Sequence, residues 1–325
     1  MDLLIDALGE TFAPTTAAFA IAAIGLNFHF GLTGLLNMGH AGFMLLGMYG
    51  FAIATREGWP LWAAFIAAMA AAAVFGLLLG WPTLKLRGDY LAIVTIAAAE
   101  MVRFLGRSQS LKGLTGASTG IRGNDFKYTF EATSPLPDEL VTVGPFTYHG
   151  TLSSSWWLRI VAWSVVVVLA VLFWRLSKSP WGRVLKGIRE DEDAVRSLGK
   201  NVYSYKMQAL VIGGVVGAIG GVFWALGNSV QPDSMGRPTT FWIWTLLLLG
   251  GAATVLGPVL GSVLFWTALL VVKGLAAQFI PDSWLPATEL EPFSLVLVGV
   301  TLMLLVIFRP QGILGDRREL AINDH

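Results

Sequence analysis

The residues of this chain that could do chemistry are polar side chains set within long apolar runs. They are Asn27, Asn37, His40, Asp89, Glu100, Arg103 and Lys273. A polar or ionisable side chain at membrane depth is costly, and it usually faces a cavity or a neighbouring helix. These positions therefore predict either a pathway for a solute or ion, or hydrogen bonds between packed helices.

One group of these residues interrupts an apolar run. The sequence N-M-G-H-A-G at 37–42 places polar residues and glycines between apolar flanks. A helix interrupted at membrane depth is tolerated where it lines a cavity. We predict that Asn37, His40 and Gly42 contribute to a translocation pathway. A satisfied hydrogen bond between two helices is the alternative.

Glu100 and Arg103 lie three residues apart, so on a helix they share one face. Mutual neutralisation near the outer end of that helix is the simpler interpretation. Contact with a solute is the alternative, and for this reason Glu100 is included among the predicted pathway residues.

The enzyme-like motifs of the sequence give no support for catalysis. The sequence G-A-S-T-G at 116–120 matches the nucleophile elbow of serine hydrolases, but it follows an apolar run rather than a strand. The chain has no cysteine, its four histidines are scattered, and no G-x-x-x-x-G-K-[ST] phosphate loop occurs. We therefore expect no catalytic residue, no cofactor and no metal.

Composition defines the class of protein that holds these residues. Of the 325 residues, 55% are hydrophobic and only 13% are charged, whereas soluble domains carry roughly 25% charged residues. Because lipid offers no partner for unpaired backbone groups, the apolar runs must be helices. The net charge of +1 gives no indication of nucleic acid. We predict an all-α, polytopic membrane protein that forms a single transmembrane domain, 1–325.

About nine runs, within a range of eight to ten, approach the roughly 20 residues that a membrane crossing needs. They centre on 15–30, 35–54, 61–81, 90–105, 156–174, 207–226, 241–255, 259–279 and 293–308. Glycine and proline near 31–34 and 250–258 indicate broken or re-entrant helices. Glycines four apart at 76/80, 213/217/221 and 257/261 predict close packing of helices.

The charged segment 176–206 sets the predicted orientation. Eight of the 22 Lys and Arg residues lie between 175 and 206, and positive loops stay in the cytoplasm. The same rule puts inside two further groups of bases, Lys85 with Arg87, and Arg309 with Arg317 and Arg318. The acidic amino end is then outside and the carboxyl end inside. The loop 106–155 is external, with runs at 126–130 and 141–148 that predict a hairpin.

The segment 181–199 reads as an amphipathic helix. Its apolar positions at helical spacing are Val184, Ile188, Val195 and Leu198, and Gly199 is a helix stop. Between two membrane spans, such a helix either lies on the bilayer surface or docks into the groove of a partner.

Together these motifs resemble a known family, the permease subunits of LIV-type ABC importers for branched-chain amino acids, and in particular the M-type of the two paired permeases. The residues that carry the resemblance are G-L-L-N-M-G-H-A-G-F at 34–43, L-R-G-D-Y-L-A-I-V-T at 86–95 running on to Glu100, L-T-G at 114–116, G-I-R-G at 120–123, G-R at 182–183, I-R-E-D-E at 188–192, L-G at 198–199, G-G at 250–251, L-G-P-V-L-G at 256–261 and R-P-Q-G at 309–312. The loop 117–119 departs from the Gly/Pro/Asn usual there.

The resemblance implies a protein that works with partners in a bacterial-type cytoplasmic (inner) membrane. A second related permease subunit would complete the channel within the membrane lipid. Two ATP-binding cassette subunits would dock on the segment 176–206, and an extracytoplasmic solute-binding protein would deliver the solute. The predicted coupling residues are Gly187, Arg189, Glu190, Asp191, Leu198 and Gly199. Replacing Arg189 or Glu190 is expected to uncouple ATP hydrolysis from uptake.

Two other functions remain open from the sequence. The same family includes importers of urea and short amides. An ion-coupled secondary transporter would instead use Asp89, Glu100 or Lys273 for coupling, while an intramembrane enzyme is the weakest alternative.

Overall fold

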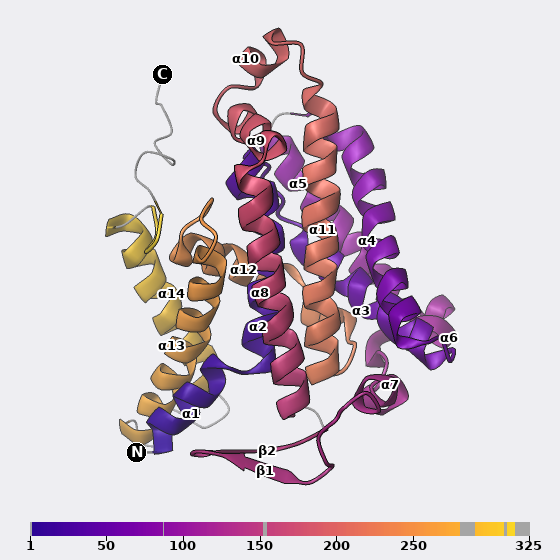
Figure 1. Ribbon diagram of the computed structural model, residues 1–325, viewed down its shortest axis with the longest axis vertical. Coiled ribbons are helices and arrows are strands. Elements are labelled where there is room, and N and C mark those ends of the chain that lie inside the picture. Colours follow the sequence, from indigo (N-terminus) through magenta and orange to yellow (C-terminus); the bar gives the residue numbers. More distant parts are fainter. Residues whose placement is uncertain (1, 87, 152–154, 280–289, 309–310, 316–325) are drawn as a thin grey trace.

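The computed structural model describes residues 2–86, 88–151, 155–279, 290–308 and 311–315. The chain forms a bundle of long helices (Figure 1), and in the described residues its only sheet is a two-stranded hairpin. The long helices are α1 (Asp2–Thr11), α2 (Pro14–Thr33), α3 (His40–Arg56), α4 (Leu61–Thr83), α5 (Gly88–Arg107), α8 (Trp156–Lys178), α9 (Pro180–Glu190), α11 (Val202–Gly227), α12 (Arg237–Gly250), α13 (Gly257–Phe279) and α14 (Leu290–Phe308). The short ones are α6 (Lys112–Thr115), α7 (Tyr128–Glu131) and α10 (Glu192–Ser197).

The mostly helical, multi-pass architecture predicted from composition is confirmed. Within the described residues, five helical stretches are long and apolar enough to cross a membrane: Ala7–Thr33, Leu61–Thr83, Trp156–Lys178, Val202–Gly227 and Gly257–Ala276. Helices also occupy the other predicted ranges, but α12 has only 14 residues, about 21 Å of helix against a hydrocarbon core of roughly 30 Å. The number of nine crossings therefore stays a prediction.

The two ends of the bundle differ in character. Helices α9 and α10 lie at one end, and α1, α7 and the hairpin lie at the other (Figure 1). The predicted orientation, with the amino end out and the carboxyl end in, is a statement about a membrane and stays a prediction. Arg87, Arg309, Arg317 and Arg318, which were used for it, fall outside the described residues.

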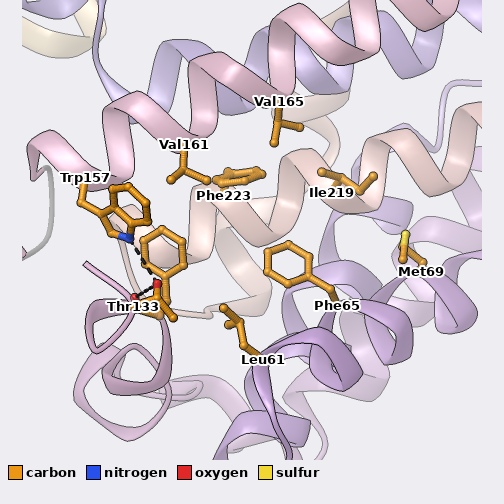
Figure 2. A pocket seen from close by; sticks show the side chains of 10 residues that line it. Leu61, Phe65, Met69, Thr133, Trp157, Val161, Val165, Ile219 and Phe223 are labelled. Carbon is orange, nitrogen blue, oxygen red and sulfur yellow. Dashed lines mark hydrogen bonds between the residues drawn. The ribbon is translucent and has the colours of Figure 1, made fainter. Parts of the chain in front are cut away.

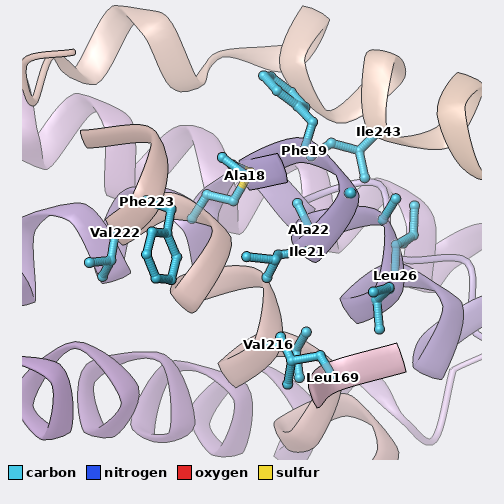
Figure 3. Packing of buried hydrophobic residues seen from close by; sticks show 14 of the residues in the cluster. Ala18, Phe19, Ile21, Ala22, Leu26, Leu169, Val216, Val222, Phe223 and Ile243 are labelled. Carbon is cyan, nitrogen blue, oxygen red and sulfur yellow. The ribbon is translucent and has the colours of Figure 1, made fainter. Parts of the chain in front are cut away.

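Helix α2 is the centre of the core. Its sequence is apolar on all sides, which is typical of a helix buried by neighbours. In Figure 3 its Ala18 and Ile21 lie among side chains of α11, such as Val216 and Phe223, with Leu169 of α8 nearby. Helices α11, α13, α8 and α12 surround it, so α2 contacts most of the bundle.

The predicted glycine steps on α11 bring helix backbones into contact. A Cβ added at Gly213 would lie 2.4 Å from the carbonyl oxygen of Gly25, and one at Gly221 would lie 2.1 Å from that of Met44. At Gly217 it would lie 2.6 Å from the His40 ring. The small-residue packing predicted for this helix is confirmed.

Two predicted spans have different boundaries in the structure. The span 35–54 was predicted too long, because α2 ends at Gly34 in the left-handed conformation (φ 69°) and α3 begins only at His40. The span 241–255 was placed too late in the chain, because α12 runs from Arg237 to Gly250, and residues 251–256, beginning with Gly251 (φ 113°), are not helical. In both cases the glycine break that the sequence indicated is confirmed, and hydropathy alone did not show where each helix stops.

The structure confirms one of the two elements that were predicted in the loop 106–155. Strands β1 (Leu140–Val143) and β2 (Phe146–His149) pair antiparallel as the expected hairpin. The run 126–130 is not a strand: Phe126 lies in a turn after a short 3-10 helix, Phe130 lies in α7, and both side chains are buried. Burial lowers the pKa of nearby Lys127, and the neighbouring Glu131 carboxylate opposes this shift.

We predict that Gly221→Ala destabilises the bundle while Gly299→Ala does not. The added methyl group at 221 meets the α3 backbone, and such overpacking typically costs about 1–3 kcal/mol. Gly299 on α14 has no neighbour within 4 Å, so there the alanine supplies only its better helix propensity. Thermal unfolding of the purified protein should show a lower midpoint for Gly221→Ala alone, and equal midpoints for both variants would contradict this packing.

Candidate functional site

The irregular segment 34–39 is held in the core by the side chain of Asn37. The Asn37 amide donates to Nδ1 of His29 at 3.1 Å, and its Oδ1 accepts from the Gly39 amide at 2.9 Å. Because an amide NH₂ can only donate, Nδ1 of His29 is the acceptor and Nε2 carries the proton. Nε2 then donates to the Leu210 carbonyl at 2.9 Å. Asn37 thus links the segment to both α2 and α11.

Backbone groups in this segment and in the first turn of α3 are satisfied by neighbouring helices. The amides of Met38 and Ala41 donate to the hydroxyls of Thr95 on α5 and Thr240 on α12, each at 3.0 Å. The indole of Trp244 donates to the Asn37 carbonyl at 3.0 Å. Since lipid cannot satisfy exposed backbone groups, these bonds allow a non-helical stretch at this depth.

His40 is buried with hydrogen-bonding capacity that it does not use. Its ring is fully enclosed, stands 5.3 Å from the His29 ring between centroids, and forms no hydrogen bond with the described residues. The ring fits only because Gly217 has no side chain. Gly42 likewise lets α5 approach, since a Cβ there would lie 3.0 Å from Ala99.

A second irregular segment, 251–256, is fixed by Asn27 of α2. The Asn27 amide donates to the Thr254 carbonyl and its oxygen accepts from the Ala253 amide, each at 2.8 Å. Ala253 has a positive φ of 64°, an uncommon conformation for alanine that persists only when its surroundings impose it. Both helix interruptions therefore depend on polar residues of α2.

Glu100 belongs to a cluster of ion pairs. Arg103 binds Glu100 at 2.6 Å and Asp233 at 2.7 Å, and Arg237 lies 3.6 Å from Glu100. The side chains of Glu100 and Arg103 are each only 15% exposed. The predicted pairing of Glu100 with Arg103 is confirmed.

The structure brings Glu100 close to the irregular segment. One small cavity, about 10 Å³, is lined by Met38, Ala41, Glu100, Arg237 and Thr240, among others. That volume is about enough for one water molecule. No space large enough for a solute is therefore open beside Glu100 in this cavity of the isolated subunit. The side chains of Asn37 and His40 are fully buried. Their role in a pathway, with that of Gly42 and Glu100, stays a prediction.

A larger cavity is unsuited to a charged solute. It measures about 360 Å³ and lies between α4, α7, α8 and α11, where Phe65, Trp157 and Phe223 contribute aromatic walls (Figure 2). No charged side chain lines it, so the ammonium and carboxylate groups of an amino acid would be desolvated without partners.

The charged segment 176–206 folds as two helices, not one. Asp191 is extended (φ −151°, ψ 102°), and its carboxylate accepts from the Ala194 amide at 2.9 Å as the N-cap of α10. The break resets the helical period, so the predicted apolar stripe is wrong at Leu198, which is 78% exposed. Ile188 and Val195 are buried as expected, and Gly199 (φ 73°) stops the helix.

Helices α9 and α10 pack on each other and on the bundle. A Cβ at Gly187 would lie 3.1 Å from Val195, so glycine permits their approach. Leu185 and Ile188 bury the inner face of α9. The Glu190 side chain is 71% exposed and points away from this contact.

Arg189 connects this helical pair to α2. Its guanidinium donates to the Gly31 carbonyl at 2.6 Å, and its side chain is only 11% exposed. A cation at the last carbonyls of a helix is favourable for both hydrogen bonding and the helix dipole. Sequence reasoning missed this contact, because 158 residues separate its partners and no local pattern relates them.

The described residues contain no group of side chains that could hold a metal ion. The nucleophile-elbow match at 116–120 also has no chemical basis. Gly116 is left-handed and Ser118 lies in a short 3-10 helix, so the strand that this motif requires is missing from that described loop.

The bundle, with its interrupted helices in the core and a charged helical pair at one end, has the features of a multi-pass membrane permease. Residues 10–306 match the family described as branched-chain amino acid transport system / permease component, and the chain belongs to this family.

Relatives from bacteria and an archaeon carry names that describe the same transport. The chain is 32% identical to the high-affinity branched-chain amino acid transport system permease protein LivM of Escherichia coli, over 94% of this chain and 70% of the relative. It is 26% identical to BraD of Pseudomonas aeruginosa over 92% of each chain. It is 27% identical to a probable LivM of Methanocaldococcus jannaschii, over 78% of this chain and 68% of the relative.

Family membership decides between the classes left open by the sequence. The chain is a non-catalytic ABC permease, and ATP hydrolysis lies with separate ATPase subunits. An ion-coupled transporter is disfavoured. Asp89 on α5 and Lys273 on α13, which that alternative would use, are exposed residues of their helices.

We predict that Asn37→Leu lowers stability. Leucine has a similar size but leaves His29 and the Gly39 amide without their partner, at about 1–3 kcal/mol for each buried group. Asn124→Leu, at an exposed position of the loop 106–155, is the matched control. Thermal unfolding should separate the two variants. An Asn37→Leu protein with an unchanged midpoint and lost uptake would instead mean that Asn37 acts in the pathway alone.

Proposed function

We propose that this chain is the M-type permease of an ATP-driven importer for branched-chain amino acids in a bacterial-type cytoplasmic membrane. The observation that carries the proposal is the family match across almost the whole chain, with relatives named for that transport. The amino end faces outside and the carboxyl end the cytoplasm, consistent with the basic helical pair and the hairpin at opposite ends of the bundle.

A second related permease covers α5 and completes the pathway. Large apolar side chains on α5 are exposed, including Ile93 and Met101 at 64% each. Glu100 lies beside them in its ion cluster. We place the pathway along this face, with Glu100 in contact with it. Asn37, His40 and Gly42 lie on the buried side of this face and hold α3 and α5 in position along the pathway.

Two ATPase subunits dock on α9 and α10 from the cytoplasm. Glu190 and Leu198 are the exposed contacts, while Gly187, Asp191 and Gly199 shape the break and the ends of the two helices. Arg189 carries the displacement to α2. At the other end, the external loop 106–155 with its hairpin receives the solute-binding protein.

Reconstitution tests this function. Proteoliposomes that contain the permease pair, the ATPase subunits and the binding protein should take up radiolabelled leucine with ATP, and the lone chain should not. Uptake by the lone chain under a proton or sodium gradient would overturn the proposal. A binding protein that retained urea in place of leucine would transfer the complex to the amide importers.

We predict that Leu198→Asp weakens ATPase docking about fivefold or more, because losing a central contact residue of an interface costs about 1 kcal/mol or more. Leu140→Asp is the control, since Leu140 is 62% exposed on the hairpin at the other end. Co-purification of ATPase subunits and their stimulated hydrolysis provide the measurement. Equal co-purification with both variants would show that α10 does not dock the ATPase.

A further inference from the structure

A polar pocket lies beside the coupling helices and has no role in the function described above. Its volume is about 660 Å³, and it is enclosed by the loop after α4, by α10 and by the first turn of α11. The loop contributes Leu84, Lys85 and Leu86, and α10 contributes Arg196.

The charges around this pocket favour an anion. Its basic residues are Lys85, Arg196, Lys200 and Lys206, and its acids are Glu192 and Asp193. Both acids are already paired, since Lys206 and Arg196 bind Glu192 and Arg196 also binds Asp193 at 2.7 Å. Lys85 and Lys200 are exposed and form no ion pair with the described residues. The lining therefore keeps an excess of two positive charges.

The surface below the pocket is apolar. On α4, Leu77, Leu78 and Trp81 are 51%, 63% and 71% exposed, so this face meets lipid when the helix spans a membrane. Tyr203 of the pocket donates to the Trp81 carbonyl at 3.3 Å. Trp and Tyr concentrate at the boundary between hydrocarbon and headgroups. The pocket thus opens at headgroup depth, directly above an acyl-chain surface.

We propose that this pocket binds an anionic phospholipid of the cytoplasmic leaflet, with its phosphate between Lys85 and Lys200 and its acyl chains along α4. The choice of leaflet rests on the proposed function, through the orientation of the coupling helices. The continuous apolar face of α4 favours a lipid over a soluble anion. A soluble anion would contact only the basic pocket and not this apolar face. Basic pockets between helices on the cytoplasmic side are suited to such headgroups.

Binding there has a mechanical consequence. The bound headgroup joins the loop after α4 to the α10–α11 connection, next to the hydrogen bond that Tyr203 of α11 donates to the Trp81 carbonyl of α4. The bound lipid therefore holds together two parts of the end on which the ATPases are proposed to act.

The test compares the purified permease complex in nanodiscs of phosphatidylcholine with and without phosphatidylglycerol. Native mass spectrometry of the released complex should show retained phosphatidylglycerol, and its presence should raise the thermal midpoint. The double variant Lys85→Gln/Lys200→Gln should retain roughly tenfold less of this lipid, because each basic contact near the surface favours anionic lipid. Lys112→Gln/Arg122→Gln, on the external loop, removes the same charge and should behave as the unmodified complex.

Three results would overturn the proposal. These are equal lipid retention by both double variants, equal stabilisation by glycerol phosphate in solution, and loss of ATPase subunits from Lys85→Gln/Lys200→Gln with lipid retained. Lipid binding is measured without transport. A complex that imports leucine but shows no lipid preference contradicts only this inference, and one that binds the lipid but imports no leucine contradicts only the proposed function.

Discussion

The structure depends on the direct backbone contact between α2 and α11. Lipid supplies no hydrophobic drive for one apolar helix to bind another, so association relies on close packing and on hydrogen bonds between helices. Gly25 and Gly213 provide the closest approach, and the hydrogen bond from His29 to the Leu210 carbonyl lies next to it. A side chain at either glycine would separate the helices and break that bond. The central position of α2 follows from this contact.

The polar residues of α2 extend this organisation to the rest of the bundle. Asn27 fixes the break before α13, His29 fixes the break before α3 through Asn37, and the Gly31 carbonyl receives Arg189 from the coupling helices. One rigid helix thus contacts both interrupted segments and the helical pair α9 and α10, where we propose that the ATPases dock. In the proposed function, these bonds carry a displacement of α9 to the two non-helical segments together, as a pathway gated by those segments would need.

Local features of the sequence predicted much of this structure. Hydropathy located the helices, glycine spacing located their close contacts, and the i, i+3 relation located the pair of Glu100 and Arg103, because each depends on neighbours a few residues away. The break at Asp191 was missed, although an acidic N-cap followed by helix formers was its signal. Contacts such as Arg189 with Gly31 join distant parts of the chain, and periodicity contains no information about them.

The central claim is that Arg189 transmits the work of the ATPases to α2. The most direct measurement is the number of ATP molecules hydrolysed per leucine imported by the reconstituted complex, for the unmodified chain and for Arg189→Ala. Assembly is first verified by the stoichiometry of the purified subunits. The account predicts that the variant assembles and hydrolyses ATP, but uses several times more ATP for each leucine. An assembled variant with an unchanged ratio would contradict it.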